Sequence, residues 1–208
     1  SYAVGCMMGR YRLDRPWLAI AHPNETKEEV ADYTIPHTNE KFWIDNDGII
    51  PLMPNDCGFH DNASNRMATI VRQVFGDESQ VENLNYIEQC LGKSIEQYFI
   101  RDFWKDHKKM YQNRPIYWLF ASKKGTFQVL VYVHRMNVAT VERIRVRYLL
   151  PFIDRLNTQI NDLVEDEATL STKERKRLQD LRRQVEECTE YYNRLAVIAE
   201  QGIVPDLD

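Results

Sequence analysis

The sequence lacks the short motifs by which many enzyme active sites and metal sites are recognised. It contains no glycine-rich phosphate loop, no Gly-x-Ser-x-Gly and no His-Glu-x-x-His. Cys57 and His60 have a spacing found at some zinc sites, but no second Cys/His pair accompanies them. The run Asp45–Gly48 resembles part of a calcium loop without its distal glutamate, so a β-turn explains it better. We therefore predict that this chain, taken alone, catalyses nothing and binds no metal.

Long apolar runs are also missing. No segment of the sequence approaches membrane-spanning length, and no secretory signal is present. The four cysteines are scattered without framework spacing, which favours reduced thiols in the cytoplasm. The sequence has no initiator Met and opens on Ser-Tyr-Ala-Val, which reads as the middle of an element. We expect a piece of a longer cytoplasmic protein that has no membrane partner.

The chain is not basic overall, but its basic residues are concentrated in one third of its length. The net charge of the 208 residues is −4. Residues 1–100 carry 8 positive and 15 negative charges, and residues 149–208 carry 8 and 13. Residues 101–148 carry 11 positive charges and 3 negative ones, which is a net charge of +8. Because a local basic patch attracts phosphate even on an acidic protein, this stretch is a candidate nucleic-acid contact.

The basic stretch is centred on two apolar runs of strand length, Ile116–Ala121 and Phe127–Val133. Both are rich in aromatic and β-branched residues, and in the second run every other side chain falls on the same face. The connection Ser-Lys-Lys-Gly-Thr places Gly125 where a positive φ is needed. The pattern predicts an antiparallel hairpin. Since a lone hairpin is marginally stable in water, we expect it to pack on helices or to join further strands.

Less regular elements are expected before residue 62. We predict a short apolar helix over residues 1–13, a strand over Trp17–Ala21 and a polar loop over His22–Asn39. A second hairpin is predicted around an Asp47-Gly48 turn, with Phe42–Ile44 and Ile49–Ile50 as its strands.

Three helices are predicted between this region and the central hairpin. They are Asn62–Phe75, Gln80–Leu91 and Ile95–Tyr111. Ser79 and Glu82 form a capping-box pattern at the start of the second helix, and Ser94 is placed to cap the third. Asp102, Asp106 and His107 all lie on the third helix, but packing accounts for this helix, so we do not expect them to act in catalysis.

After the central hairpin, two long helical segments predict an antiparallel coiled-coil arm. The first begins at Val138 or Thr140, is expected to kink at Pro151, and ends near Asp166. The second runs from about Lys173 to Gln201 with apolar residues at heptad spacing. We predict an α+β fold, mainly helical, with a small antiparallel sheet and this long helical hairpin. Its expected domains are a target-recognition-like domain, residues 1–137, and the arm, residues 138–208.

Three features resemble a known family. They are the opening SYAVGCMMGRYRLD, the block IRDFWKDHKKMYQNRPIYWLFASKKGTFQVLVYVHR and the trailing helical hairpin. They are similar to the C-terminal region of PglX-type adenine-specific DNA methyltransferases of phage-exclusion (BREX) systems, and of related type II restriction enzyme methylase subunits. The resemblance is weakest over His22–Pro54. It implies an upstream catalytic domain that binds S-adenosylmethionine and flips adenine into a pocket with an Asn-Pro-Pro-aromatic motif. Neither that motif nor a cofactor glycine loop occurs here, so we expect no cofactor in this chain.

The resemblance and the charge pattern together predict a non-catalytic DNA-recognition or spacer region. Such a region needs cations for phosphates and polar side chains for base edges. With Tyr117 interleaved, the candidate DNA-binding residues are Arg101, Lys105, Lys108, Lys109, Arg114, Lys123, Lys124, Gln128, His134 and Arg135. The expected partners are double-stranded DNA through the full-length enzyme, the upstream methyltransferase domain and other defence-system proteins. The alternative is a structural helical-hairpin module that mediates oligomerisation or partner binding without contacting DNA.

Overall fold

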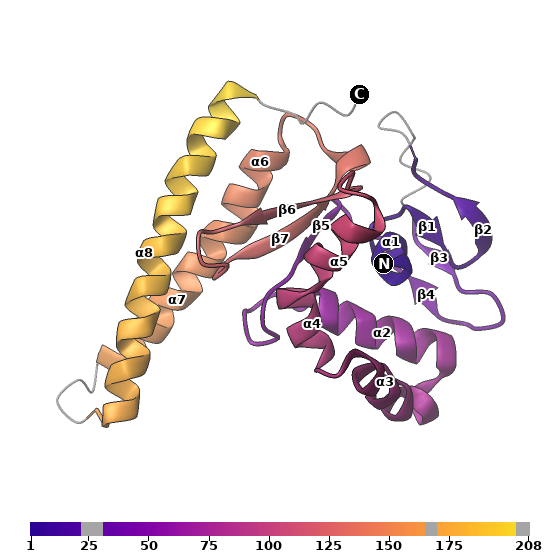
Figure 1. The fold of residues 1–208 in the computed structure, drawn as a ribbon, viewed down its shortest axis with the longest axis horizontal. Helices are drawn as coiled ribbons and strands as arrows, with labels where there is room; N and C mark the ends of the chain where they lie inside the picture. Colours follow the sequence, from indigo (N-terminus) through magenta and orange to yellow (C-terminus); the bar gives the residue numbers. More distant parts are fainter. Residues whose placement is uncertain (22–30, 165–169, 203–208) are drawn as a thin grey trace. The chain divides into compact units, whose positions relative to one another are not determined.

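A computed structural model describes residues 1–21, 31–164 and 170–202 of the chain (Figure 1). The fold is α+β, mainly helical with small antiparallel sheets, which confirms the predicted fold class. The chain divides into two compact units. Unit 1 comprises Ser1–Phe120 and Val129–Met136, and unit 2 comprises Ala121–Gln128 and the described residues from Asn137 onward. The tip of the central hairpin, Ala121–Gln128, is therefore part of unit 2, and the rest of the hairpin is part of unit 1.

The central hairpin forms as predicted and gains a third strand. It consists of β6 (Tyr117–Ala121) and β7 (Gln128–Tyr132), and Gly125 in its connection has a φ of +77°. The third strand, β5 (Ile49–Pro51), runs antiparallel to β7, so that the strand order is β5-β7-β6. Pro51 is compatible with β5 because an edge strand needs backbone donors on one side only.

The predicted second hairpin is wrong. Its first expected strand contributes to β4 (Lys41–Phe42), which pairs with β3 (Tyr33–Thr34), whereas Ile49–Pro51 pairs with β7. The Asp45 carboxylate accepts hydrogen bonds from the backbone N–H groups of Asp47, Gly48 and Ile49, at 3.1, 2.6 and 3.1 Å. In this turn the Asp45 side chain, and not a partner strand, accepts the hydrogen bonds of these backbone N–H groups. The strand β5 that follows is therefore available to pair with β7.

The N-terminal helix is shorter than the one predicted over residues 1–13. Helix α1 (Tyr2–Met7) ends before Gly9, which has a φ of +81°, and the chain then forms β1 (Tyr11–Arg12) and β2 (Arg15–Leu18). The observed strand β2 therefore begins and ends earlier in the chain than the strand predicted over Trp17–Ala21. A Cβ atom on Gly5 would lie 2.3 Å from the Tyr11 ring, so this close approach requires glycine. Of the predicted loop over His22–Asn39, residues 22–30 lie outside the described residues, and the remainder contains β3.

The first predicted helix is observed as α2 (Ala63–Phe75), with the Asn62 side chain capping its N-terminus. Helix α3 (Asp77–Leu91) begins three residues earlier than predicted, directly after Gly76. The predicted capping box is absent there, because the Ser79 hydroxyl donates to the carbonyl of Phe75 at 2.6 Å. Ser79 thus lies inside the first turn of α3 and does not precede it.

The third predicted helix is two helices, α4 (Ile95–Arg101) and α5 (Phe103–Met110). Ser94 caps α4 as predicted, with its hydroxyl accepting from the Gln97 N–H at 3.1 Å. The break falls at Asp102, whose φ of −117° departs from helical geometry and whose carboxylate pairs with Lys93 at 2.6 Å. The core of unit 1 joins these helices to α1 and the sheet through buried side chains that include Met7, Met8, Phe99, Phe103, Leu130 and Tyr132.

Unit 2 contains the predicted helical arm. Helix α6 (Thr140–Arg143) continues through a π-helical turn, Ile144–Leu149, into α7 (Leu150–Val164). The π turn ends at Leu149, just before Pro151, whose missing N–H and ring make a regular α-helix unfavourable over the preceding turn. Helix α8 (Thr172–Gln201) begins with a capping box of Ser171 and Glu174. Helices α7 and α8 lie side by side as an antiparallel hairpin (Figure 1).

No helix within the described ranges is long and apolar enough to cross a membrane. The four cysteines are free thiols: Cys6, Cys57 and Cys188 are buried, and Cys90 is exposed.

Candidate nucleic-acid interface

Helix α5 presents three lysines on the side of the helix that faces away from the core of unit 1. Phe103 and His107, one turn apart, are buried. At 100° per residue, Lys108, Lys105 and Lys109 follow one another around the remaining surface, and Lys105 and Lys109 are exposed. We call these three lysines the α5 basic face. Two of them, Lys108 and Lys109, lie in the last turn, where the helix dipole favours positive charge.

His107 fixes this helix to the beginning of β6. Its side chain is 1% exposed, and its Nε2 atom accepts hydrogen bonds from the N–H groups of Ile116 and Tyr117 at 3.2 and 3.4 Å. Burial is the main cause that lowers the pKa of His107 to about 4, and the positive charges of the N-terminal ammonium group and of Arg10 contribute to the same shift. The imidazole is therefore neutral near pH 7, as its role as an acceptor requires.

Two tryptophans border the α5 basic face. Trp104 on α5 and Trp118 on β6 meet with ring centroids 6.3 Å apart and an interplanar angle of 66°. The Lys108 ammonium lies 5.6 Å from the centroid of the Trp104 ring, within range of a cation–π interaction. Neither tryptophan was singled out from the sequence. Strand alternation was the available signal, because it places Trp118 on the face opposite the buried Tyr117.

Arg101 and Arg114 flank the α5 basic face in the chain, and both are exposed. Arg101 is the last residue of α4. Arg114 follows two residues with left-handed backbone, Gln112 and Asn113, whose φ values are 51° and 63°. These two residues redirect the chain from α5 toward β6.

Lys123 and Lys124 belong to unit 2, at the tip of the hairpin, and both are exposed. The tip is held by Glu187 of α8. The carboxylate of Glu187 accepts from the Ser122 hydroxyl and the Lys124 N–H, both at 2.6 Å, and from the Thr126 hydroxyl at 2.7 Å. Burial alone would raise the pKa of Glu187, but these hydrogen bonds outweigh it and lower the pKa below its usual range. The two lysines thus project from an anchored loop.

Three other predicted residues have roles inside the fold. The guanidinium of Arg135 donates to the backbone carbonyls of Met8, Asp45 and Asn46, at 3.3, 2.6 and 2.8 Å. The Gln128 amide donates to the carbonyl of Gly125 at 3.2 Å, within the tip. His134 is half-buried, with its ring 5.4 Å from that of Tyr132.

The interleaved aromatic residue, Tyr117, is fully buried and presents no surface to a ligand. Among the predicted cations, Lys108 and Arg135 are half-buried, and the exposed ones are Arg101, Lys105, Lys109, Arg114, Lys123 and Lys124.

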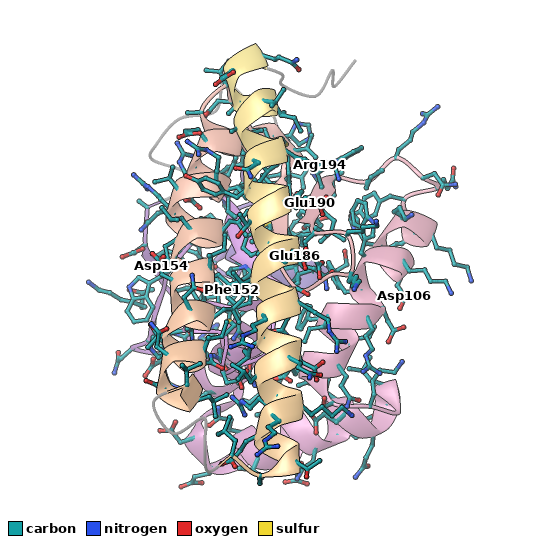
Figure 2. The ribbon with its side chains drawn as sticks, turned by 90° about the vertical axis from the view of Figure 1, so that its left-hand side faces the viewer. Asp106, Phe152, Asp154, Glu186, Glu190 and Arg194 are labelled. Atoms are coloured by element: carbon teal, nitrogen blue, oxygen red, sulfur yellow. The ribbon has the colours of Figure 1, made fainter. Side chains whose placement is uncertain are left out.

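The acidic residues of α4 and α5 do not converge on a catalytic arrangement. Asp102 is paired with Lys93, His107 is buried, and Asp106 lies on the exposed side of α5 (Figure 2). Within the described ranges, no group of three or more His, Cys, Asp or Glu side chains is placed to bind a metal.

Unit 1 also has an open hollow of about 500 Å³. Its lining includes Trp43, Asp45, Asp61 and Arg66, with Arg66 paired to Asp45 at 3.2 Å. Burial, together with the charge of Asp45, raises the pKa of Asp61. This acidic lining repels phosphate, so the hollow is not part of the basic surface.

The exposed side of the arm carries mixed charge. Glu186, Glu190 and Arg194, spaced by four residues, lie along the outer side of α8 (Figure 2). Such an exposed stripe of charged residues is typical of a solvated helix face. It resembles neither the α5 basic face nor a phosphate-binding surface.

The anchoring of the hairpin tip gives a direct prediction. Glu187→Ala should lower the free energy of unfolding of unit 2 by about 2 kcal/mol, because a charged acceptor of several hydrogen bonds is lost. Since the pKa of Glu187 is lowered in the folded state, its contribution is present above pH ~4.5 and disappears as the pH falls through the folded-state value.

Denaturant unfolding of the chain measures this effect. Glu190→Ala, at an exposed position on the same helix, serves as the control and should leave stability nearly unchanged. Equal effects of the two substitutions would show that the tip does not depend on Glu187.

The fold and the basic surface together define the chain as an α+β module with a helical arm and exposed cations on α5 and on the hairpin tip. No family model matches the chain. It is 42% identical over its whole length to the adenine-specific methyltransferase BrxX of Escherichia coli O9:H4 (strain HS). It is 33% identical, again over its whole length, to the adenine-specific methyltransferase PglX of Lacticaseibacillus casei (strain Zhang).

The chain is therefore homologous to a segment of the PglX-type adenine-specific methyltransferases, which confirms the resemblance seen in the sequence. It spans 18% of the length of each of these two relatives.

Proposed function

We propose that this chain is a non-catalytic, DNA-contacting segment of an S-adenosylmethionine-dependent, adenine-specific DNA methyltransferase of a phage-defence or restriction–modification system. The observation that carries the proposal is the α5 basic face, with Lys105 and Lys109 exposed in a chain that is otherwise acidic. The relatives named as adenine-specific methyltransferases support it. In this proposal the methyl donor and the catalytic residues belong to another part of the enzyme.

Each unit contributes its own cations to the proposed contact. The α5 basic face acts from unit 1, and Lys123 and Lys124 act from the anchored tip in unit 2. Lysine side chains can bind phosphates from many directions, because the ammonium group is a compact charge at the end of a flexible side chain. Such contacts position the protein on the duplex and do not read its sequence. We therefore propose that double-stranded DNA is the partner, held jointly with the methyltransferase domain and in the presence of other defence-system proteins.

The test is the salt dependence of duplex binding by the full-length methyltransferase that contains this chain. Each phosphate contact releases condensed counterions, so the logarithm of affinity falls with the logarithm of salt with a slope of about −0.9 per contact. Lys105→Ala with Lys109→Ala should reduce the magnitude of the slope by about two. Lys123→Ala with Lys124→Ala should do the same. Arg135 is omitted because its guanidinium binds three backbone carbonyls, so its replacement would perturb folding.

A charge-matched control is Lys41→Ala with Lys176→Ala, since both lysines are exposed and neither belongs to the proposed contact. The control should leave the slope unchanged. If both test pairs also leave affinity and slope unchanged, the basic residues are ordinary solvated surface. The competing function, a helical-hairpin module for oligomerisation or partner binding, would then be favoured, and its own support is the long helical hairpin of α7 and α8.

A further inference from the structure

Trp118 is an exposed indole at the edge of a sheet whose other strands are buried. It is 45% exposed, whereas every residue from Val129 to Tyr132 on the central strand β7 is buried. Trp118 on the edge strand β6 remains exposed, whereas the other edge strand, β5, is buried throughout. A large aromatic side chain that stays exposed often marks a surface that contacts a partner or ligand, whereas single small apolar residues on a surface do not.

The Trp118 ring is supported on one side by a chain of aromatic contacts. Its ring meets that of Trp104 at 66°, and the Trp104 ring lies 6.1 Å from the imidazole of His107 at 25°. His107 is in turn fixed by its hydrogen bonds to the backbone before and at the start of β6. The indole is thus held in place before any ligand binds, which lowers the entropic cost of stacking on it.

One lysine of α5 lies beside Trp104, and the other two follow it around the helix. The Lys108 ammonium lies 5.6 Å from the centroid of the Trp104 ring, and Lys105 and Lys109 continue around the helix surface. A supported aromatic ring beside several lysines is the combination that binds unpaired nucleotides, in which the base stacks and the cations hold the phosphate. A base inside a duplex has both faces covered by its neighbours and cannot stack in this way.

We propose that Trp118, supported by Trp104 and bordered by the α5 basic face, is a stacking site for an unpaired nucleobase. The inference rests on the proposed function, because it assumes that DNA phosphates reach the α5 basic face. It adds a ligand class to that surface: a nucleotide outside the base-paired stack.

Exposure alone does not select Trp118. Trp17 and Trp43 are more exposed, at 65% and 59%. Trp43 lines the acidic hollow with Asp45 and Asp61, where a phosphate would be repelled. Trp118 differs in being joined to a lysine-rich helix through Trp104. This charge complementarity favours a nucleotide over an apolar protein partner, which would have to desolvate the neighbouring lysines.

The experiment compares two DNA probes with the 208-residue chain at low salt. One is a duplex with a single unpaired 2-aminopurine, and the other is the same duplex with that base paired. The wild-type chain should prefer the unpaired probe by roughly 5-fold or more, and should quench its fluorescence on binding. Trp118→Ala should abolish both the preference and the quenching. Trp118→Phe should retain most of each, and Trp43→Ala is the matched exposed-tryptophan control.

The outcomes separate this inference from the function on which it rests. If the wild-type chain shows no preference, or if Trp118→Ala keeps it, the stacking site is overturned. In that case Lys105→Ala with Lys109→Ala would still weaken binding of both probes if the DNA contact is correct. If neither the tryptophan nor the lysine substitutions change binding, both proposals fail. Circular dichroism of Trp118→Ala should match the wild-type chain, since the side chain lies at the surface.

Discussion

Replacing Leu181 by aspartate is expected to destabilise the helical arm by about 3 kcal/mol or more. Leu181 lies on α8 and is 5% exposed, and Leu178 on α8 and Leu156 on α7 are buried as well. A carboxylate at this position loses the apolar burial and is itself costly to bury, so both effects act in the same direction. Costs of this size are typical of disrupted cores.

Denaturant unfolding measures the effect, and Asn193→Asp is the control. Asn193 is exposed on the same helix, so this substitution adds the same charge without changing the core and should cost little. The wild-type unfolding midpoint should also be independent of protein concentration, because α7 and α8 pair within one chain. A strong concentration dependence, or equal stability of the Leu181→Asp variant and the wild type, would contradict the packing of the arm.

Acidification should weaken unit 1 through His107. Burial lowers the folded-state pKa of His107 to about 4, whereas an unfolded histidine titrates near ~6.5. Between these two values the unfolded chain binds more protons, so stability rises with pH. The contribution of His107 is fully present above pH ~6.5 and is lost as the pH falls toward 4. The difference of about 2.5 units corresponds to about 3 kcal/mol.

The measurement is the free energy of unfolding as a function of pH for the wild-type chain and for His107→Gln. Glutamine can accept a hydrogen bond but does not titrate, so the variant should lose most of the slope between pH 6.5 and 4. The same replacement at His60, which is exposed, provides the control and should keep the wild-type slope. An unchanged slope in His107→Gln would mean that another group accounts for the acid sensitivity.

Protonation of His107 also has a local consequence. A protonated imidazole cannot accept from the N–H groups of Ile116 and Tyr117, so the connection between α5 and β6 would open first. The amide protons of these two residues should therefore exchange faster at low pH than those of β7.

Several elements were determined by neighbouring residues alone and could be predicted from the sequence. The alternation of side chains in Phe127–Val133 and the positive φ of Gly125 specified the central hairpin. The side chain of Asn62 specified the start of α2, and the apolar seams specified the arm helices. These signals depend on residues that are two to four positions apart in the sequence. Their spacing does not depend on how the rest of the chain folds.

Other features depended on partners outside the range of a local sequence pattern. The strand Ile49–Pro51 pairs with β7, about eighty residues further on, because Asp45 satisfies the turn that a local hairpin would have used. The two helices α4 and α5 separate at Asp102, where Lys93 binds its carboxylate. A local pattern cannot reveal either outcome, since both are decided by which groups remain unsatisfied once the chain has folded.

The candidate site divides in the same way. The sequence by itself determined that the basic charge lies between residues 101 and 148, because composition is independent of folding. Only the tertiary structure decided how each cation is used: Arg135 binds internal carbonyls, Lys105 and Lys109 face solvent, and the two tip lysines stand on a loop anchored by Glu187. Likewise, only the folded chain shows that Trp118 is 45% exposed while its neighbour Tyr117 is buried. Whether a side chain is buried, paired or free to meet a ligand depends on what packs around it, and that environment exists only in the folded chain.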